Sequence, residues 1–225
     1  MSTEVSERYL GEQGVAYGAA RQPDPDDPGY LIDFQYFKPY LRPEQVVLDF
    51  GCGNGGILRQ AQTHVAKVEG VEVNPASREI ARRAGAVVHE SIEAIPPGSR
   101  YDVIFSNHVL EHVRDVCRTL EALRPLLAPG GRLLLKLPFD DANSAYQKTW
   151  SAADIDHHLY TWTPRVLANL LMETGYRVES CRLITAAWHP RLFWLSRLGL
   201  ADLAFWALAV IKRRRQTFAV AVNAD

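Results

Sequence analysis

A carboxylate followed by a cluster of glycines is the stretch of this chain that points most directly to chemistry. Asp49 ends an apolar run over residues 46–50, and glycines follow at positions 51, 53, 55 and 56. Residues 57–65 are compatible with a helix. A strand, a tight turn and a helix start form the first unit of a doubly wound sheet, where ligands bind beyond the carboxyl ends of strands. Glycines let a ligand approach the main chain there.

The charge of Asp49 decides which ligand this turn suits. Gly51, Gly53 and Gly56 fit the G-x-G-x-x-G spacing, which alone is a weak sign of a dinucleotide site. Asp49 precedes the first glycine by two residues and would face the ligand, so a pyrophosphate would be repelled in a partly desolvated cleft. An ammonium group would be attracted, and S-adenosylmethionine carries one beside its cationic sulfonium. The sequence therefore favours S-adenosylmethionine, with a nicotinamide-dependent oxidoreductase as an alternative.

Residues 47–55, Val-Leu-Asp-Phe-Gly-Cys-Gly-Asn-Gly, resemble the first motif of the class I S-adenosylmethionine-dependent methyltransferases. This resemblance implies an α/β fold: a doubly wound, Rossmann-like, mostly parallel seven-stranded sheet with an antiparallel last strand. It also implies that the motif's residues contact the cofactor, namely Asp49, Gly51, Cys52, Gly53 and Gly55.

A second acidic position supports the same cofactor. Glu72 follows Gly51 by about 20 residues, at the tip of the second expected strand (68–73), where a carboxylate can accept both ribose hydroxyls. Val73 is its predicted neighbour at the cofactor. After the third expected strand (86–88), many family members place an Asp that accepts the adenine amino group, and Ser91 stands there instead. The resemblance implies that Ser91, Glu90 or backbone groups bind adenine and that Ile92 packs on the ring.

The segment after the fourth expected strand (101–106) reads Asn-His-Val-Leu-Glu-His over residues 107–112. It resembles the same segment in methyltransferases related to the ubiquinone-biosynthesis O-methyltransferases, where a Leu-Glu-His triplet recurs. The resemblance implies that Asn107 contacts the cofactor and that His108 lies between cofactor and acceptor. Glu111 and His112 are expected one helical turn further on, and Glu111 is equally interpreted as a cap of the next helix, whose N-terminus favours a carboxylate.

Histidines are the candidate bases, because methyl transfer to a hydroxyl must remove a proton and imidazole titrates near neutral pH. The candidates are His108, His112, His157 and His158. Each has the alternative interpretation of a hydrogen-bonded structural histidine, and an amine or carbanion acceptor would need no such base. A metal site from Asp156, His157 and His158 is not expected, because adjacent histidines on an extended segment point in opposite directions.

These residues must be positioned by alternating helices and strands in one domain. Residues 1–29 are expected to be an N-terminal segment that ends in a Pro/Asp-rich linker, and residues 30–225 the methyltransferase domain. In the family such a segment often folds over the cofactor, so Tyr17 and Arg21 are candidates there or else solvated surface residues. Further helices are expected at 30–41, 76–84, 113–127 and 164–174, and further strands at 132–137, 176–185 and 217–222.

The insertion over residues 186–215, between the sixth and seventh strands, is unusual. Residues 192–211 are heavily apolar and lead into Lys212, Arg213, Arg214 and Arg215. Three interpretations stay open: a helical lid over the substrate, a homodimer surface, or an interfacial helix in peripheral contact with an anionic membrane through 192–215. The first and third suit an apolar or lipid-like acceptor.

Composition narrows the class of partner. The 225 residues carry a net charge of −1, which provides no general attraction to nucleic acid, and no Asn/Asp-Pro-Pro-Tyr/Phe motif follows the fourth strand. Three widely spaced cysteines and no apolar leader predict a reducing, cytoplasmic setting. We expect a small-molecule methyltransferase acting at oxygen, with a cofactor-binding but catalytically inactive partner subunit as an alternative.

Overall fold

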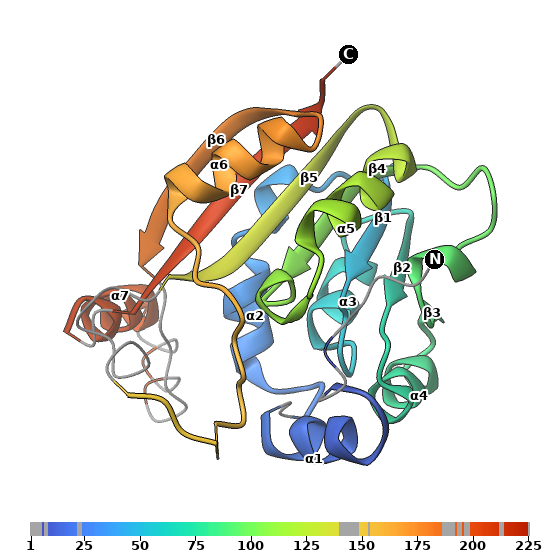
Figure 1. Cartoon of the computed structure of the whole chain (residues 1–225). Helices are drawn as coiled ribbons and strands as arrows, with labels where there is room; N and C mark the ends of the chain where they lie inside the picture. Colours follow the sequence, from blue (N-terminus) through green and yellow to red (C-terminus); the bar gives the residue numbers. More distant parts are fainter. Residues whose placement is uncertain are drawn as a thin grey trace.

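The computed structural model describes residues 6, 9–21, 24–139, 149–152, 154–185, 192, 195, 199–211 and 214–224. The described strands form one seven-stranded sheet in the order β3-β2-β1-β4-β5-β7-β6 (Figure 1). These strands are β1 (Val46–Phe50), β2 (Lys67–Val71), β3 (Val87–His89), β4 (Tyr101–Asn107), β5 (Leu127–Phe139), β6 (Tyr176–Thr185) and β7 (Arg215–Asn223). The α-helices are α1 (Gly11–Arg21), α2 (Pro28–Phe34), α3 (Gly56–Gln62), α4 (Pro75–Arg83), α5 (Val116–Leu123), α6 (Pro164–Glu173) and α7 (Ala201–Ile211).

Strand directions agree with the predicted architecture. β1 pairs in parallel with β2 and β4, β2 pairs in parallel with β3, and β4 with β5, whereas β7 runs antiparallel to both β5 and β6. The prediction of a doubly wound, mostly parallel sheet with an antiparallel last strand is confirmed. Because the chain order reverses between β1 and β4, a crevice opens beyond their carboxyl ends, which is where such folds bind ligands.

Helices cover both faces of the sheet (Figure 1). On one face, Leu120 of α5 and Leu167 of α6 pack with Leu48 and Ile104 in one apolar cluster. On the other face, Phe34 of α2, Leu58 of α3 and Ala81 of α4 pack with strand residues in a second cluster. Side chains alternate between the two faces along each strand, so a strand buried on both faces is apolar throughout.

Several element boundaries differ from the sequence prediction. The helix expected at 30–41 is two pieces, α2 and the 3₁₀ helix η2 (Lys38–Tyr40), because Pro39 disfavours a continued helix. The helix expected from residue 113 begins at Val116, where Asp115 caps it by accepting from the Arg118 N–H at 3.0 Å. The 3₁₀ helix η4 (Leu110–His112) precedes α5 and η5 (Arg124–Leu126) follows it, while η3 (Ile92–Ala94) lies between β3 and β4.

The N-terminal segment lies across the carboxyl ends of the strands rather than apart from the domain. α1 contacts α4, and the Ser6 N–H donates to the carbonyl oxygen of His112 at 3.3 Å. The segment expected to precede the domain therefore covers the crevice. Its division from residues 30–225 stays a prediction.

The helical insertion between β6 and β7 is present as α7, which contacts β6. Residues 186–191, 193–194, 196–198, 212 and 213 of the insertion lie outside the described part. No helix in the described ranges is both long and apolar enough to cross a membrane. The lid, dimer and membrane interpretations of 192–215 stay predictions.

Candidate functional site

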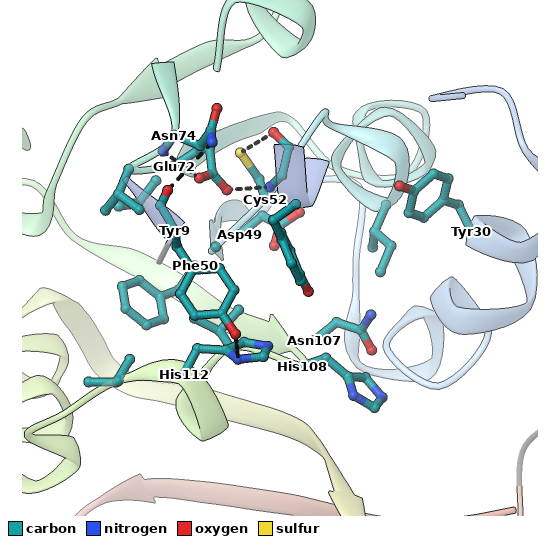
Figure 2. A pocket seen from close by; sticks show the side chains of 18 residues that line it. Tyr9, Tyr30, Asp49, Phe50, Cys52, Glu72, Asn74, Asn107, His108 and His112 are labelled. Atoms are coloured by element: carbon teal, nitrogen blue, oxygen red, sulfur yellow. Dashed lines mark hydrogen bonds between the residues drawn. The ribbon is translucent and has the colours of Figure 1, made fainter. Parts of the chain in front are cut away.

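A cavity of about 230 Å³ lies at the carboxyl ends of β1, β2 and β4, between these strands and the N-terminal segment. Figure 2 shows Tyr9 and His112 on one side of Asp49 and Tyr30 on the other. The cavity brings together nine of the residues that the sequence predicts to bind the cofactor or act as the base: Asp49, Gly51, Cys52, Gly53, Glu72, Val73, Asn107, His108 and His112.

Asp49 ends its strand inside the cavity and is 2% exposed. Its Oδ2 atom has no hydrogen-bond partner among the described residues. Burial raises the pKa of Asp49 well above its usual range, and the nearby Glu72 carboxylate raises it further. A carboxylate buried in this way favours a cationic ligand, which would restore its charged form.

Glu72 stands just beyond β2 and holds the glycine turn in place. Its Oε2 accepts the Gly53 N–H at 2.8 Å and its Oε1 accepts the Asn74 N–H at 2.7 Å. Burial raises the pKa of Glu72, although these backbone donors oppose the shift. Because each carboxylate oxygen accepts more than one hydrogen bond, Glu72 keeps capacity for ligand hydroxyls.

Two glycines of the turn are required by close packing. Gly51 has a φ of 78°, and a Cβ there would lie 2.2 Å from Cγ2 of Val109. At Gly56 a Cβ would lie 2.1 Å from the ring of Tyr30, whose hydroxyl donates to Asn54 Oδ1 at 2.9 Å. Any larger residue would therefore displace a wall of the cavity.

A buried lysine orients Asn107. Lys136 of β5 is fully buried, and its Nζ lies 2.8 Å from Asp33 Oδ1 of α2 and 3.1 Å from Asn107 Oδ1. Since the ammonium takes the amide oxygen of Asn107, the amide nitrogen is left as a donor. Asn107 therefore offers N–H groups to a ligand in the cavity.

His108 has unusual backbone geometry, with a φ of 56° directly after β4. Such left-handed conformations at non-glycine residues are strained and concentrate at functional sites.

The His108 Nδ1 lies 3.2 Å from Oε1 of Glu111, at ion-pair distance. Burial would raise the pKa of Glu111, but His108 and two further histidines outweigh this and lower it.

Glu111 does not cap the next helix, and that interpretation was wrong. It lies in η4, is fully buried, and faces histidines, while Asp115 supplies the cap. The reason is the 3₁₀ turn, which separates Glu111 from α5 and directs its side chain inward.

His112 is held by Tyr9, a residue from the opposite end of the sequence. The Tyr9 hydroxyl lies 2.5 Å from His112 Nδ1 and also donates to the carbonyl oxygen of Asp156. Because the single hydroxyl proton goes to that carbonyl, the network assigns the Nδ1 proton to His112 and leaves Nε2 with a lone pair. Burial lowers the pKa of His112 to about 4, so the ring is neutral.

Several residues singled out from the sequence do not line the cavity, among them Gly55, Ser91, Ile92, His157 and His158. Gly55 (φ 87°) serves instead as the N-cap of α3. Ser91 stands at the N-cap of η3, and Ile92 is buried in one apolar cluster of the core. His157 lies in the loop before α6, where its N–H donates to Asp154 Oδ2 at 3.2 Å. The adenine-binding roles of Ser91 and Ile92 stay predictions.

The cavity also includes residues that the sequence did not single out, chiefly Tyr9, Tyr30 and Asn74. No local pattern marks them. Tyr17, one of the candidates from the N-terminal segment, does line the cavity, whereas the side chain of Arg21 lies outside the described part.

Comparison with known proteins decides the family. Residues 29–181 match the model of a family described as a methyltransferase domain. The chain belongs to this methyltransferase family. The family expected from the glycine motif is thereby confirmed.

Curated relatives of this methyltransferase include O-methyltransferases. The chain is 31% identical over 116 residues to a malonyl-[acyl-carrier protein] O-methyltransferase of Enterobacter lignolyticus, covering 50% of this chain and 46% of the relative. It is 29% identical over 146 residues to a ubiquinone biosynthesis O-methyltransferase of Cereibacter sphaeroides, covering 57% and 59%. The chain thus matches about half the length of these curated relatives.

A solved structure has the same fold. The Burkholderia thailandensis 1,6-didemethyltoxoflavin-N1-methyltransferase, with its substrate and S-adenosylhomocysteine bound, aligns with a TM-score of 0.60 at 18% identity. The alignment covers 94% of this chain and 85% of that one. At this identity the likeness establishes the fold.

Proposed function

We propose that this protein transfers the methyl group of S-adenosylmethionine to an oxygen atom of a small molecule. The observation that carries this proposal is the buried Oδ2 of Asp49 at the glycine turn, which accepts no hydrogen bond from any described residue. A cationic ligand satisfies that carboxylate, whereas a pyrophosphate would add like charge to a buried site.

The cavity residues fit S-adenosylmethionine in both charge and hydrogen bonding. Asp49 would take the ammonium group, Glu72 the ribose hydroxyls, and Asn107 would donate through its amide nitrogen. When bound, the cofactor supplies an activated methyl group on a sulfonium. The chain's own task is then to align the acceptor, exclude water and remove a proton.

We assign the proton removal to His108. Its Nδ1 lies 3.2 Å from Oε1 of the buried Glu111, and this carboxylate favours a proton on Nδ1, which leaves the Nε2 lone pair to act as the base. The His108 side chain is 32% exposed, which gives an acceptor access to it. His112 is less suited, because Tyr9 holds its Nδ1 and the lowered pKa makes it a weak base.

Calorimetry and a transfer assay test the proposal together. S-adenosylhomocysteine should bind to the full chain at one site, and NADH should not compete with it. Radiolabelled S-adenosylmethionine should then methylate hydroxyl acceptors in preference to amines of matched shape. Binding of NADH at the same site would contradict the cofactor assignment. Binding of S-adenosylhomocysteine without transfer to any acceptor class would favour the inactive-subunit alternative.

For the insertion we propose an anionic lipid surface as the partner, which would deliver an apolar acceptor. Apolar side chains of α7 are exposed, with Trp206 at 58% and Ile211 at 78%, and the exposed Arg214 and Arg215 follow. The protein should sediment with anionic but not with neutral vesicles, and R213E/R214E/R215E should weaken this. Unchanged sedimentation would exclude the lipid surface, and a concentration-dependent dimer in solution would favour the homodimer.

A further inference from the structure

A second cluster of potential ligands lies beside the cavity, outside the residues assigned to the cofactor. Glu111 and His112 come from η4, and His158 comes from the loop before α6. One ligand atom of each lies within 4.8 Å of those of the other two. The rings of His112 and His158 are 5.0 Å apart between centroids.

Glu111 is an unsatisfied acceptor in this cluster. It is fully buried, and neither carboxylate oxygen has a hydrogen bond from any residue that the structure describes. A buried carboxylate is costly unless it is paired with a charge, hydrogen-bonded or bound to a metal. The nearby His108 Nδ1 approaches one oxygen only, at 3.2 Å from Oε1.

His112 presents a second acceptor to the same space. Because Tyr9 fixes the proton on Nδ1, the Nε2 lone pair is directed to the side of Glu111, whose Oε1 is 3.9 Å away. A lone pair and a carboxylate repel each other unless a cation lies between them. Metal-binding histidines usually hydrogen-bond through the other ring nitrogen in this way, which fixes the tautomer that can bind.

We propose that Glu111, His112 and His158 bind one divalent transition-metal ion of the zinc type. Two imidazoles and one carboxylate are a donor set that suits zinc and its neighbours, whereas Mg²⁺ and Ca²⁺ prefer oxygen ligands. Tyr9 acts as a positioning residue, and only one of the two adjacent histidines takes part.

The position of this metal site beside the cavity suggests a role for the ion in activating the acceptor. His112 also lines the cavity, on the side of His108 and Val109, so an ion held here would lie at the wall facing the acceptor. A bound divalent ion lowers the pKa of a hydroxyl or water that reaches it. This consequence rests on the proposed methyl transfer, but the metal site itself does not.

Zinc titration of the full chain after chelator treatment tests the site. Calorimetry should give one Zn²⁺ per chain, and Co²⁺ should produce a visible absorption band from its ligands. H158A should weaken Zn²⁺ binding by about tenfold or more, and Y9F should weaken it by about 10- to 100-fold. The matched control is His157→Asn, which changes the neighbouring histidine, keeps a residue type suited to its φ of 42°, and should leave Zn²⁺ binding unchanged.

Two outcomes would overturn the metal site: no stoichiometric Zn²⁺ binding, or equal binding by wild type and H158A. Equal losses in H158A and His157→Asn would overturn the assignment as well. S-adenosylhomocysteine should bind equally to chelated and zinc-loaded protein, so failure of the metal site and failure of the proposed methyl transfer give different results. Circular dichroism of each variant confirms that it is folded.

Discussion

At one end of the cavity, Asp49, Gly53 and Glu72 belong to a single strand–helix–strand unit, whereas Tyr9, His112 and His158 at the other end come from three distant segments. The Gly53–Glu72 hydrogen bond spans 19 residues, and the Tyr9–His112 contact spans 103. We call these the cofactor end and the acceptor end. The difference shows that the proposed cofactor site is built from residues close together in the chain, whereas the proposed acceptor site depends on contacts between distant segments.

The strongest test of this contrast is His108→Asn at the acceptor end. Asparagine tolerates the left-handed backbone at this position but cannot act as the base. Methyl transfer to a hydroxyl should fall by about 10²- to 10⁴-fold in kcat, as is usual when a general base is lost. The affinity of His108→Asn for S-adenosylhomocysteine should stay unchanged. The control His157→Asn should keep both its transfer rate and its affinity. Steady-state kinetics measures the rate and calorimetry the affinity; if His108→Asn lost affinity as much as rate, the two ends would not be separable.

Asp33→Asn tests the buried lysine that orients Asn107 at the cavity. It would leave the Lys136 ammonium buried with no carboxylate partner in the described structure, at a cost of about 3 kcal/mol in the free energy of unfolding. Lys136→Met should cost less, because the side chain of Asp33 is 24% exposed and can be hydrated. Urea denaturation measures both variants. The reverse order of stabilities would contradict a buried ion pair between α2 and β5.

Asp49→Asn tests the cofactor end. The amide keeps the shape of the side chain but removes the charge opposite the ammonium group, so affinity for S-adenosylhomocysteine should fall by about 10- to 100-fold. Stability should not fall, because burial of the charged carboxylate is itself unfavourable in the empty protein. Calorimetry and thermal denaturation check the two expectations, and unchanged affinity would remove the basis of the proposed function.

The smallest expected effect is a pH dependence of cofactor binding. The pKa of Asp49 is raised in the empty protein, and an ammonium beside it would lower that pKa, so binding favours the deprotonated form and releases a proton. Affinity should therefore fall as the pH drops through the raised pKa, by at most about tenfold per pH unit. Calorimetry in two buffers of different ionisation enthalpy detects the proton. Asp49→Asn should remove the dependence, and its persistence there would assign the proton to another group.

Sequence reasoning worked where residues near each other in the chain determine the result. The sixth strand was expected at 176–185, and β6 runs over Tyr176–Thr185. Gly51, Gly53 and Glu72 line one cavity, because a strand end and the following turn are set by local sequence; their contact with the cofactor stays a prediction. Boundaries were wrong where a cap or a proline decides them, as at Asp115 and Pro39.

Sequence reasoning failed where a side chain's role depends on distant neighbours. Glu111 is an acidic residue shortly before a helix, which is where a capping charge is expected. Only its position beside His108 and His112 in the folded chain shows that its side chain faces inward. Tyr9 and Lys136 carry no local signal, because their partners lie about a hundred residues away.

The amino-acid order alone determined the parallel sheet, the glycine turn and the carboxylates at the cofactor end, because strand patterns and turn residues act over a few positions. Only the tertiary structure decided which histidines lie close together, which residues contact them and which ring nitrogen of His112 carries the proton. Those features depend on burial and on contacts between segments far apart in the chain.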